Sequence, residues 1–128
     1  MIIVDTSVWI NWFKKGSTGP QEDDLKKIVM CGPVFQEILQ GIRDSSKVET
    51  LKKSLLSLDW VDRSLPALRF DQAATIYREG RRRGITIRSS IDCLIAAIAI
   101  QNGLPIFHQD RDYDAIAKFT PLLLSKKL

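Results

Sequence analysis

The chain opens with Met1-Ile2-Ile3-Val4-Asp5-Thr6-Ser7-Val8-Trp9-Ile10, a run that joins an apolar strand to a helix at an aspartate. Residues 1–4 are predicted as a buried strand and residues 6–14 as the first helix. Ligands of α/β proteins bind beyond the carboxyl ends of strands, which is where Asp5 falls. A carboxylate there either caps the following helix or belongs to a functional site. The other acidic residues decide between these two interpretations.

Composition narrows the class of protein. Hydrophobic residues make up 45% of the 128 residues and charged residues 27%, which is typical of a folded globular chain and excludes a disordered one. No apolar run reaches the roughly 18 residues that span a membrane, and the N-terminus lacks the pattern of a signal peptide, so we expect a cytoplasmic protein. Cys31 and Cys93 have no metal-ligand spacing and are expected to be packed, reduced thiols.

Strand-like and helix-like segments alternate along the chain. Short strands are expected at 29–31, around 60–61, at 104–107 and at 121–124. Helices are expected at 22–28, from Pro33 to 41 or 43, and at 47–56, 68–83, 91–102 and 112–118, whereas 85–87 is a loop or marginal strand. This alternation predicts an α/β fold with a central parallel sheet flanked by helices, as one domain over residues 1–128.

The helix at 91–102 contains the clearest anomaly. It is apolar almost all round and is therefore expected to be buried, yet Asp92 lies in its first turn. A carboxylate at a helix N-terminus is favoured by ~0.3–1 kcal/mol, so capping is an alternative. Ser89 and Ser90 already offer a cap, however, and a buried anion needs a partner or a metal. This favours a site over a cap for Asp92.

Two further groups of acidic residues are less distinctive. Glu37 lies mid-helix among apolar residues, and taken alone it reads as an exposed glutamate. Asp110, Asp112 and Asp114 follow the strand that ends at Phe107, and a helix cap explains only one of them. In a parallel sheet Asp5 and Asp110 emerge at the same edge, and the start of a central helix brings Asp92 there.

The chemistry of these residues points to a metal. A cluster of carboxylates is the ligand set of Mg²⁺ or Mn²⁺. His108 is the only histidine, which argues against a histidine-based zinc site or triad, and the sequence has no glycine-rich phosphate loop. An aspartyl-phosphate mechanism calls for a second aspartate two residues after Asp5, where Ser7 stands. The acids therefore indicate metal-dependent chemistry on phosphate oxygens.

Four blocks of the sequence, in order, resemble one family. They are Ile2-Ile3-Val4-Asp5-Thr6-Ser7-Val8-Trp9-Ile10, Pro33-Val34-Phe35-Gln36-Glu37-Ile38-Leu39-Gln40-Gly41, Asp92-Cys93-Leu94-Ile95-Ala96-Ala97 and His108-Gln109-Asp110-Arg111-Asp112-Tyr113. Together they resemble PIN domains, and in particular the VapC-type toxins of type II toxin–antitoxin pairs. The resemblance implies a Rossmann-like parallel sheet and an endoribonuclease that depends on Mg²⁺ or Mn²⁺. It departs from the family at His108, where threonine is frequent, and in the short loop at 15–24.

The resemblance also assigns roles to residues. The catalytic and metal-binding acids map onto Asp5, Glu37, Asp92 and Asp110, with Thr6, Ser7 and Asp112 as accessories. Asp5 and Asp92 are expected to bind the metal directly, whereas Glu37 and Asp110 bind through water or act as base and second-metal ligands. One or two ions are compatible with this set. Because four carboxylates repel one another, we expect the metal to relieve strain in the site.

Partners follow from the resemblance as well. It implies a VapB-type antitoxin, a homodimer and a structured RNA substrate such as tRNA or ribosomal RNA, whose cleavage would inhibit translation. A formal net charge of +4 and a cluster of arginines permit contact with RNA phosphates, and a solvated face is the alternative. The arginines expected to bind RNA are Arg78, Arg81, Arg82 and Arg88. A competing function is a non-catalytic PIN-like module that binds operator DNA with its antitoxin.

Overall fold

A five-stranded parallel sheet forms the centre of the computed structural model, which describes residues 1–128. The strand order is β3-β2-β1-β4-β5, and every neighbouring pair is parallel. The predicted α/β class is therefore confirmed. The strands are β1 (Ile2–Val4), β2 (Ile28–Met30), β3 (Asp59–Trp60), β4 (Ile106–Phe107) and β5 (Leu124–Ser125).

Seven α-helices and one 3₁₀ helix connect the strands. They are α1 (Thr6–Phe13), α2 (Glu22–Leu25), α3 (Gly32–Gly41), the 3₁₀ helix η1 (Ser45–Lys47), α4 (Val48–Leu56), α5 (Ala67–Arg82), α6 (Ser90–Asn102) and α7 (Arg111–Ala117). Gly103 ends α6 with a φ of 64°, a left-handed conformation that glycine adopts without a Cβ clash. None of these helices is both long and apolar enough to cross a membrane.

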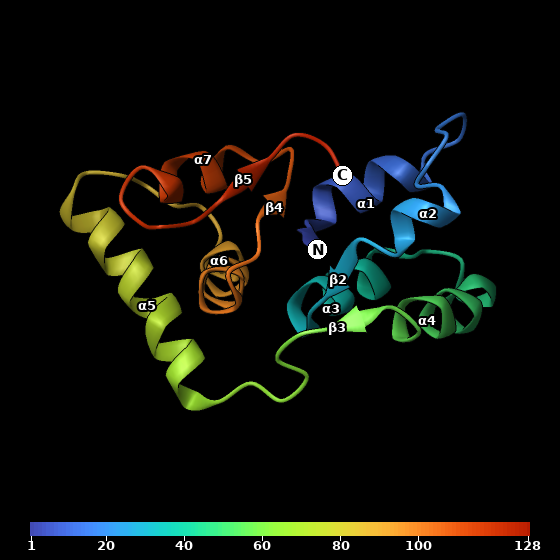
Figure 1. The fold of residues 1–128 in the computed structure, drawn as a ribbon, viewed down its shortest axis with the longest axis horizontal. Helices are drawn as coiled ribbons and strands as arrows, with labels where there is room; N and C mark the ends of the chain where they lie inside the picture. Colours follow the sequence, from blue (N-terminus) through green and yellow to red (C-terminus); the bar gives the residue numbers. More distant parts are fainter.

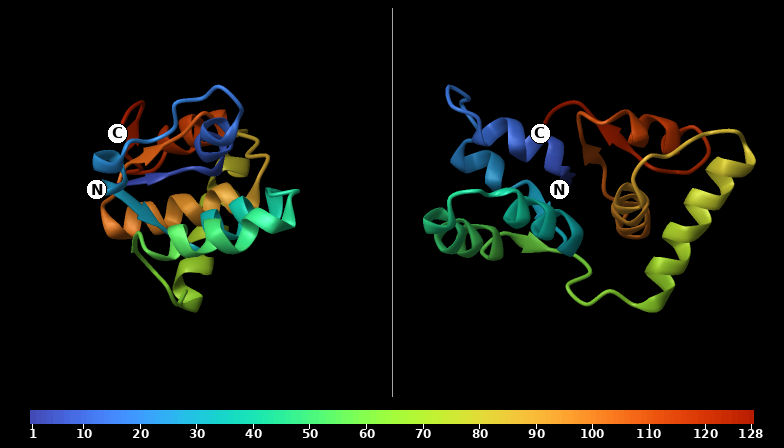
Figure 2. Two further views of the ribbon diagram at one scale, coloured as in Figure 1. Left: turned by 90° about the vertical axis from the view of Figure 1, so that its right-hand side faces the viewer. Right: turned by 180° about the vertical axis from the view of Figure 1, so that it is seen from behind.

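The helices cover the sheet in two layers. In Figure 1, α1, α2 and α4 lie on one side of the strands, and α5, α6 and α7 lie on the other. The view from behind in Figure 2 shows the same division, with α5 as the outermost helix beyond α6. The chain winds from β1 to β2 and β3, then crosses to β4 and β5 on the opposite side of β1. The order reverses between β1 and β4, and the carboxyl ends of such strands form the crevice in which α/β proteins bind ligands.

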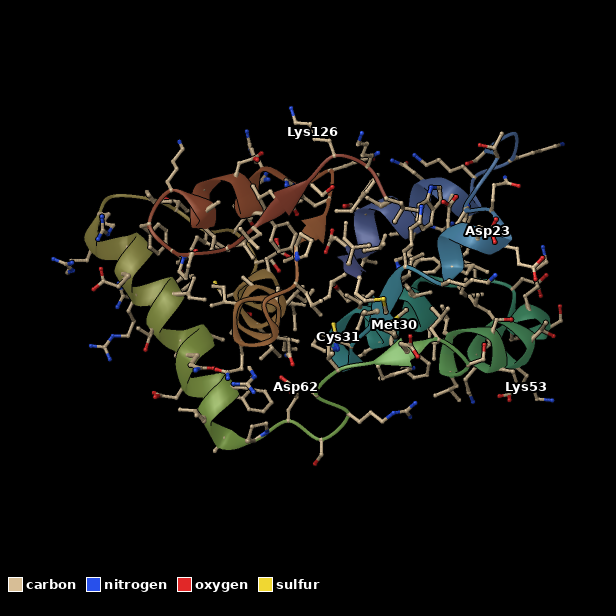
Figure 3. All side chains as sticks on the ribbon, in the orientation of Figure 1. Asp23, Met30, Cys31, Lys53, Asp62 and Lys126 are labelled. Atoms are coloured by element: carbon tan, nitrogen blue, oxygen red, sulfur yellow. The ribbon has the colours of Figure 1, made fainter.

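The interior is one apolar cluster of 26 buried residues. Helix α6 is buried along its length, from Asp92 to Ala99, because it is packed between the sheet and α5. Figure 3 shows Met30 and Cys31 at the end of β2 in the interior, whereas Asp23, Lys53 and Lys126 project from the surface. Both cysteines are free and buried, as predicted, and burial raises the pKa of Cys31 to about 12. Such thiols are inert near neutral pH.

Several predicted boundaries were wrong. The helix expected at 22–28 ends at Leu25, because buried Ile28 begins β2 one short turn later. The last strand lies at Leu124–Ser125 instead of 121–124, since only Leu124 and Ser125 pair with β4. Helix α3 begins at Gly32, one residue before Pro33. The segment 85–87 is a loop, and the other boundaries agree to within about two residues.

Candidate metal and catalytic site

Asp5 both caps a helix and faces the site. It is the N-cap of α1, where its Oδ2 accepts hydrogen bonds from the Ser7 amide at 3.1 Å and the Ser7 hydroxyl at 2.6 Å. Its other oxygen, Oδ1, accepts a hydrogen bond from the Tyr113 hydroxyl at 2.7 Å, although the side chain is almost fully buried. The cap, one of the two alternatives offered by the sequence for Asp5, is therefore present. It orients Oδ2, whereas Oδ1 faces Tyr113.

Asp110 repeats this arrangement at the end of β4. It is the N-cap of α7 and accepts a hydrogen bond from the Asp112 amide at 2.9 Å. The predicted meeting of the acids after β1 and β4 results from the parallel pairing of these strands, in which Val4 lies beside Phe107. Ser7 strengthens this junction, because its hydroxyl oxygen accepts a hydrogen bond from the Gln109 amide at 3.2 Å.

Asp92 has no capping role. Ser89 is the N-cap of α6 through its backbone alone, since its side chain makes no capping hydrogen bond, contrary to the expectation for this serine. The only hydrogen bond to Asp92 comes from the Tyr113 hydroxyl, 3.3 Å from Oδ1. Its Oδ2 is the one buried side-chain polar atom of the chain without any hydrogen-bond partner. An unpartnered buried carboxylate oxygen is costly unless a cation or proton satisfies it.

Three carboxylates converge closely enough to share an ion. One oxygen each of Asp92, Asp110 and Asp112 lies within 4.8 Å of the others, and no other acid, histidine or cysteine group of the chain gathers in this way. Asp112, which was predicted as an accessory, is almost fully buried and contributes one of these three oxygens. Oxygen donors alone suit Mg²⁺ or Mn²⁺ better than softer metals. The donor set and the unpartnered oxygen of Asp92 both fit a divalent cation.

The charges of the acids perturb one another. Burial, followed by the negative charge of Asp110, raises the pKa of Asp92 to about 8. Burial also raises the pKa of Glu37, and the charges of Asp5 and Asp110 add to this shift. A cation in the cluster would reverse the effect of the neighbouring charges. Without a cation, burial and the neighbouring negative charges therefore disfavour the ionised forms of Asp92 and Glu37.

Glu37 is half-buried on α3 and is joined to the site by Thr6. The Thr6 hydroxyl donates a hydrogen bond to Glu37 Oε1 at 2.9 Å, and this bond lowers the glutamate pKa against the larger effect of burial. Thr6 and Ser7 were expected to support the metal or a bound water. In this structure their hydroxyls donate to Glu37 and Asp5 and so hold the acids themselves.

Tyr113 is a site residue that the sequence did not reveal. Its side chain is fully buried, and its hydroxyl lies between Asp5 and Asp92. Burial and the two nearby charges raise its pKa well above the usual value of tyrosine, so the hydroxyl remains a proton donor. One signal in the sequence could have pointed to it. The buried face of a helix whose first turn contains acids carries a tyrosine there, where a purely apolar aromatic residue would suffice for packing.

His108 lies beside the acid cluster and donates no hydrogen bond to its carboxylates. Its Nδ1 accepts a hydrogen bond from the Asp110 amide at 3.2 Å, and its ring packs on Tyr113 at 5.1 Å between centroids. Both contacts place His108 beside the site. It also helps to fix the backbone of Asp110.

The four predicted RNA-binding arginines separate into two places. Arg78, Arg81 and Arg82 lie on the exposed face of α5, where Arg82 pairs with Glu79 at 2.8 Å and Arg81 lies over the Tyr77 ring. Arg88 precedes α6 and is the only basic residue that forms ion pairs with the acid cluster, at 3.8 Å from Asp110 and 3.6 Å from Asp112.

The parallel sheet and the acid cluster define an α/β domain with a candidate cation site, and comparison with known proteins identifies the family. The PIN domain family model matches residues 2–119, and the chain belongs to this family. It is 42% identical over 132 residues to VapC ribonuclease Mb1587 of Mycobacterium bovis, covering 95% of this chain and 96% of that protein. Ribonuclease VapC11 of Mycobacterium tuberculosis matches with the same identity and coverage.

Solved structures share the fold at lower identity. The crystal structure of VapBC2 from Rickettsia felis, bound to a DNA fragment from its promoter, aligns with a TM-score of 0.72 and 21% identity over 98% of both chains. FitAcB from Neisseria gonorrhoeae aligns with a TM-score of 0.64 and 18% identity, over 97% of this chain and 96% of that one. These likenesses confirm the Rossmann-like sheet of a PIN domain.

Proposed function

We propose that the chain is a VapC-type endoribonuclease toxin that hydrolyses RNA phosphodiesters with the help of Mg²⁺ or Mn²⁺. The observation that carries this proposal is the unpartnered buried oxygen of Asp92 among the carboxylates of Asp110 and Asp112. An unpartnered buried oxygen does not stabilise the fold, whereas a bound cation would satisfy it. The 42% identity with two proteins named as VapC ribonucleases supports RNA as the substrate.

The residues proposed to hold the metal are Asp92, Asp110 and Asp112, whose oxygens form one group, together with Asp5 and Glu37, which the resemblance implies and which lie outside that group. When bound, a divalent ion supplies an activated water and stabilises charge on the phosphate oxygens. The Tyr113 hydroxyl donates its proton to Asp5 Oδ1 at 2.7 Å and lies 3.3 Å from Asp92 Oδ1, so it holds the two acids on either side of one oxygen. The Ser7 hydroxyl fixes the second oxygen of Asp5, so that the ligands are held before an ion arrives.

Glu37 is the proposed general base. Burial raises its pKa towards neutrality, which brings a carboxylate closer to the value at which proton transfer from water is efficient. The Thr6 hydroxyl donates a hydrogen bond to its Oε1, which favours the ionised form. Attack of water in line with the scissile bond is expected to leave a 5′-phosphate and a 3′-hydroxyl.

The remaining features of the proposal concern partners. Arg78, Arg81, Arg82 and Arg88 are the proposed contacts to RNA phosphates, which would otherwise be repelled by the acids. We infer a VapB-type antitoxin, a homodimer and action in the cytoplasm on a structured RNA such as tRNA or ribosomal RNA. A non-catalytic role in operator binding is disfavoured, because all four acids expected of a nuclease are present and the named relatives are ribonucleases.

Antitoxin-free protein incubated with a total RNA pool tests the assignment. We expect cleavage with Mg²⁺ or Mn²⁺, none with EDTA, and a loss of at least about a hundredfold in Asp92→Asn, since a proposed metal ligand that caps no helix is removed. The matched control is Asp114→Asn, which alters an exposed acid of α7 that lies outside the cluster. Folded wild-type protein that cleaves no RNA with either ion would refute the function.

A further inference from the structure

Arg88 stands in an unusual position for an arginine of a cation-binding site. It lies in the loop between α5 and α6, and its guanidinium bridges two carboxylates of the cluster, with Nη2 3.8 Å from Asp110 Oδ1 and Nε 3.6 Å from Asp112 Oδ1. No other lysine or arginine pairs with these acids. The positive charge that balances the metal-free cluster therefore comes from this one side chain.

The contacts of Arg88 are loose. Both distances exceed 3.5 Å, so the guanidinium forms ion pairs without a hydrogen bond to either acid. Its side chain is 55% exposed, whereas the Asp112 side chain is 4% exposed. The Asp112 carboxylate is held separately, because its Oδ2 accepts a hydrogen bond from the Ser89 amide at 3.2 Å. The acid is thus fixed while the arginine is free to leave.

The same two carboxylates cannot serve the guanidinium and a divalent ion equally. Asp112 Oδ1 and Asp110 Oδ1 are the atoms nearest to Arg88, and these two carboxylates are also members of the three-acid group that fits a cation. A divalent ion there would weaken the attraction between Arg88 and the acids and would repel its charge. The exposed guanidinium would then be available to a negatively charged group beside the metal.

We propose that Arg88 is a displaceable counter-ion: it neutralises Asp110 and Asp112 in the metal-free protein and gives up this position to the divalent ion, after which it binds an RNA phosphate. Its role in RNA binding rests on the proposed ribonuclease function, whereas its competition with the ion does not. Two opposite effects follow from one substitution. Loss of Arg88 strengthens metal binding and weakens RNA binding.

A matched control is available next to the site. Arg111 lies between Asp110 and Asp112 in the sequence, is exposed, and forms no ion pair or side-chain hydrogen bond. Arg111→Gln removes the same charge close to the cluster without removing a contact. Comparison of Arg88→Gln with Arg111→Gln therefore separates direct competition from the general effect of net charge.

Isothermal titration with Mn²⁺ on the full chain measures the competition. For Arg88→Gln we expect an Mn²⁺ Kd about fivefold lower than that of the wild type, since a partly exposed ion pair is worth up to about a fivefold change in affinity. Arg111→Gln should change the Kd less than about twofold. Arg88→Lys, which keeps the charge, should stay near the wild type and also guards against a folding defect in the glutamine variant.

Fluorescence anisotropy with a phosphorothioate RNA oligonucleotide in Mn²⁺ measures the second effect. We expect Arg88→Gln to bind this RNA several-fold more weakly than Arg111→Gln does. An unchanged or weaker Mn²⁺ affinity in Arg88→Gln, or an equal gain in Arg111→Gln, would overturn the counter-ion role. If the Mn²⁺ results hold while the wild type cleaves no RNA, the ribonuclease proposal fails and the competition between Arg88 and the ion stands.

Discussion

Replacement of Asp92 by asparagine should stabilise the metal-free protein at pH 8 and remove most of the dependence of its stability on pH. Burial raises the pKa of Asp92 from 3.8 to about 8, so the folded protein holds a proton between these values that the unfolded chain has released. The stabilisation from this proton is complete below pH 4 and is lost as the pH rises through 8. Asparagine is neutral throughout this window and keeps an oxygen that can accept the Tyr113 hydrogen bond.

The size of the effect follows from linkage. One proton bound only by the folded state changes the free energy of unfolding by about 1.4 kcal/mol per pH unit. Between pH 5 and pH 7, wild-type protein in EDTA should therefore lose roughly 2 to 3 kcal/mol of stability through Asp92 alone. This is a large part of the about 5–15 kcal/mol typical of a folded domain.

Urea unfolding followed by circular dichroism at pH 5, 6, 7 and 8 in EDTA measures this slope. Asp114→Asn is the control, because Asp114 is exposed and outside the cluster. Mg²⁺ added at pH 8 should restore stability to the wild type and much less to Asp92→Asn, since the ion binds the deprotonated carboxylate. Equal pH slopes in wild type and Asp92→Asn would refute the assignment of the proton to Asp92.

Two other substitutions test the hydrogen bonds around the site. Tyr113→Phe should lower the free energy of unfolding by about 1 to 3 kcal/mol in a urea titration at pH 8, because buried Asp5 loses a charge-assisted hydrogen bond of 2.7 Å; an unchanged midpoint would contradict this. Thr6→Val should raise the pKa of Glu37, because it removes the hydrogen bond that favours the ionised form. The acid limb of the pH–rate profile should then move to higher pH, whereas Thr75→Val, which only loses a bond to the backbone of α5, should leave the limb in place.

Much of the fold could be predicted because its signals are local. The apolar runs that end at Val4 and Phe107 and the acids that follow them indicate strands with functional carboxyl ends, and parallel pairing then brings Asp5 and Asp110 together. Asp92 could be recognised because a charge inside a wholly apolar helix has no local explanation. These features depend on residues within a few positions of one another.

The parts that could not be predicted depend on how distant elements pack. Tyr113 reads as a core aromatic, and only the orientation of α7 against α6 brings its hydroxyl to Asp5 and Asp92. The separation of Arg88 from the arginines of α5 likewise depends on the loop that carries the chain back to α6. Sequence spacing alone places all of these arginines in one group.

Some acids of the site also cap helices, and this decides which acid is the most informative one to substitute. Asp5 and Asp110 cap α1 and α7, so their removal alters both the fold and the site, and a loss of activity in either variant has two explanations. Asp92 makes no cap, and its second oxygen has no partner. Its substitution should therefore remove a function while relieving the fold, because the cost of keeping this carboxylate buried serves only the cation. A variant that gains stability as it loses metal binding is the strongest evidence that a buried charge is kept for function.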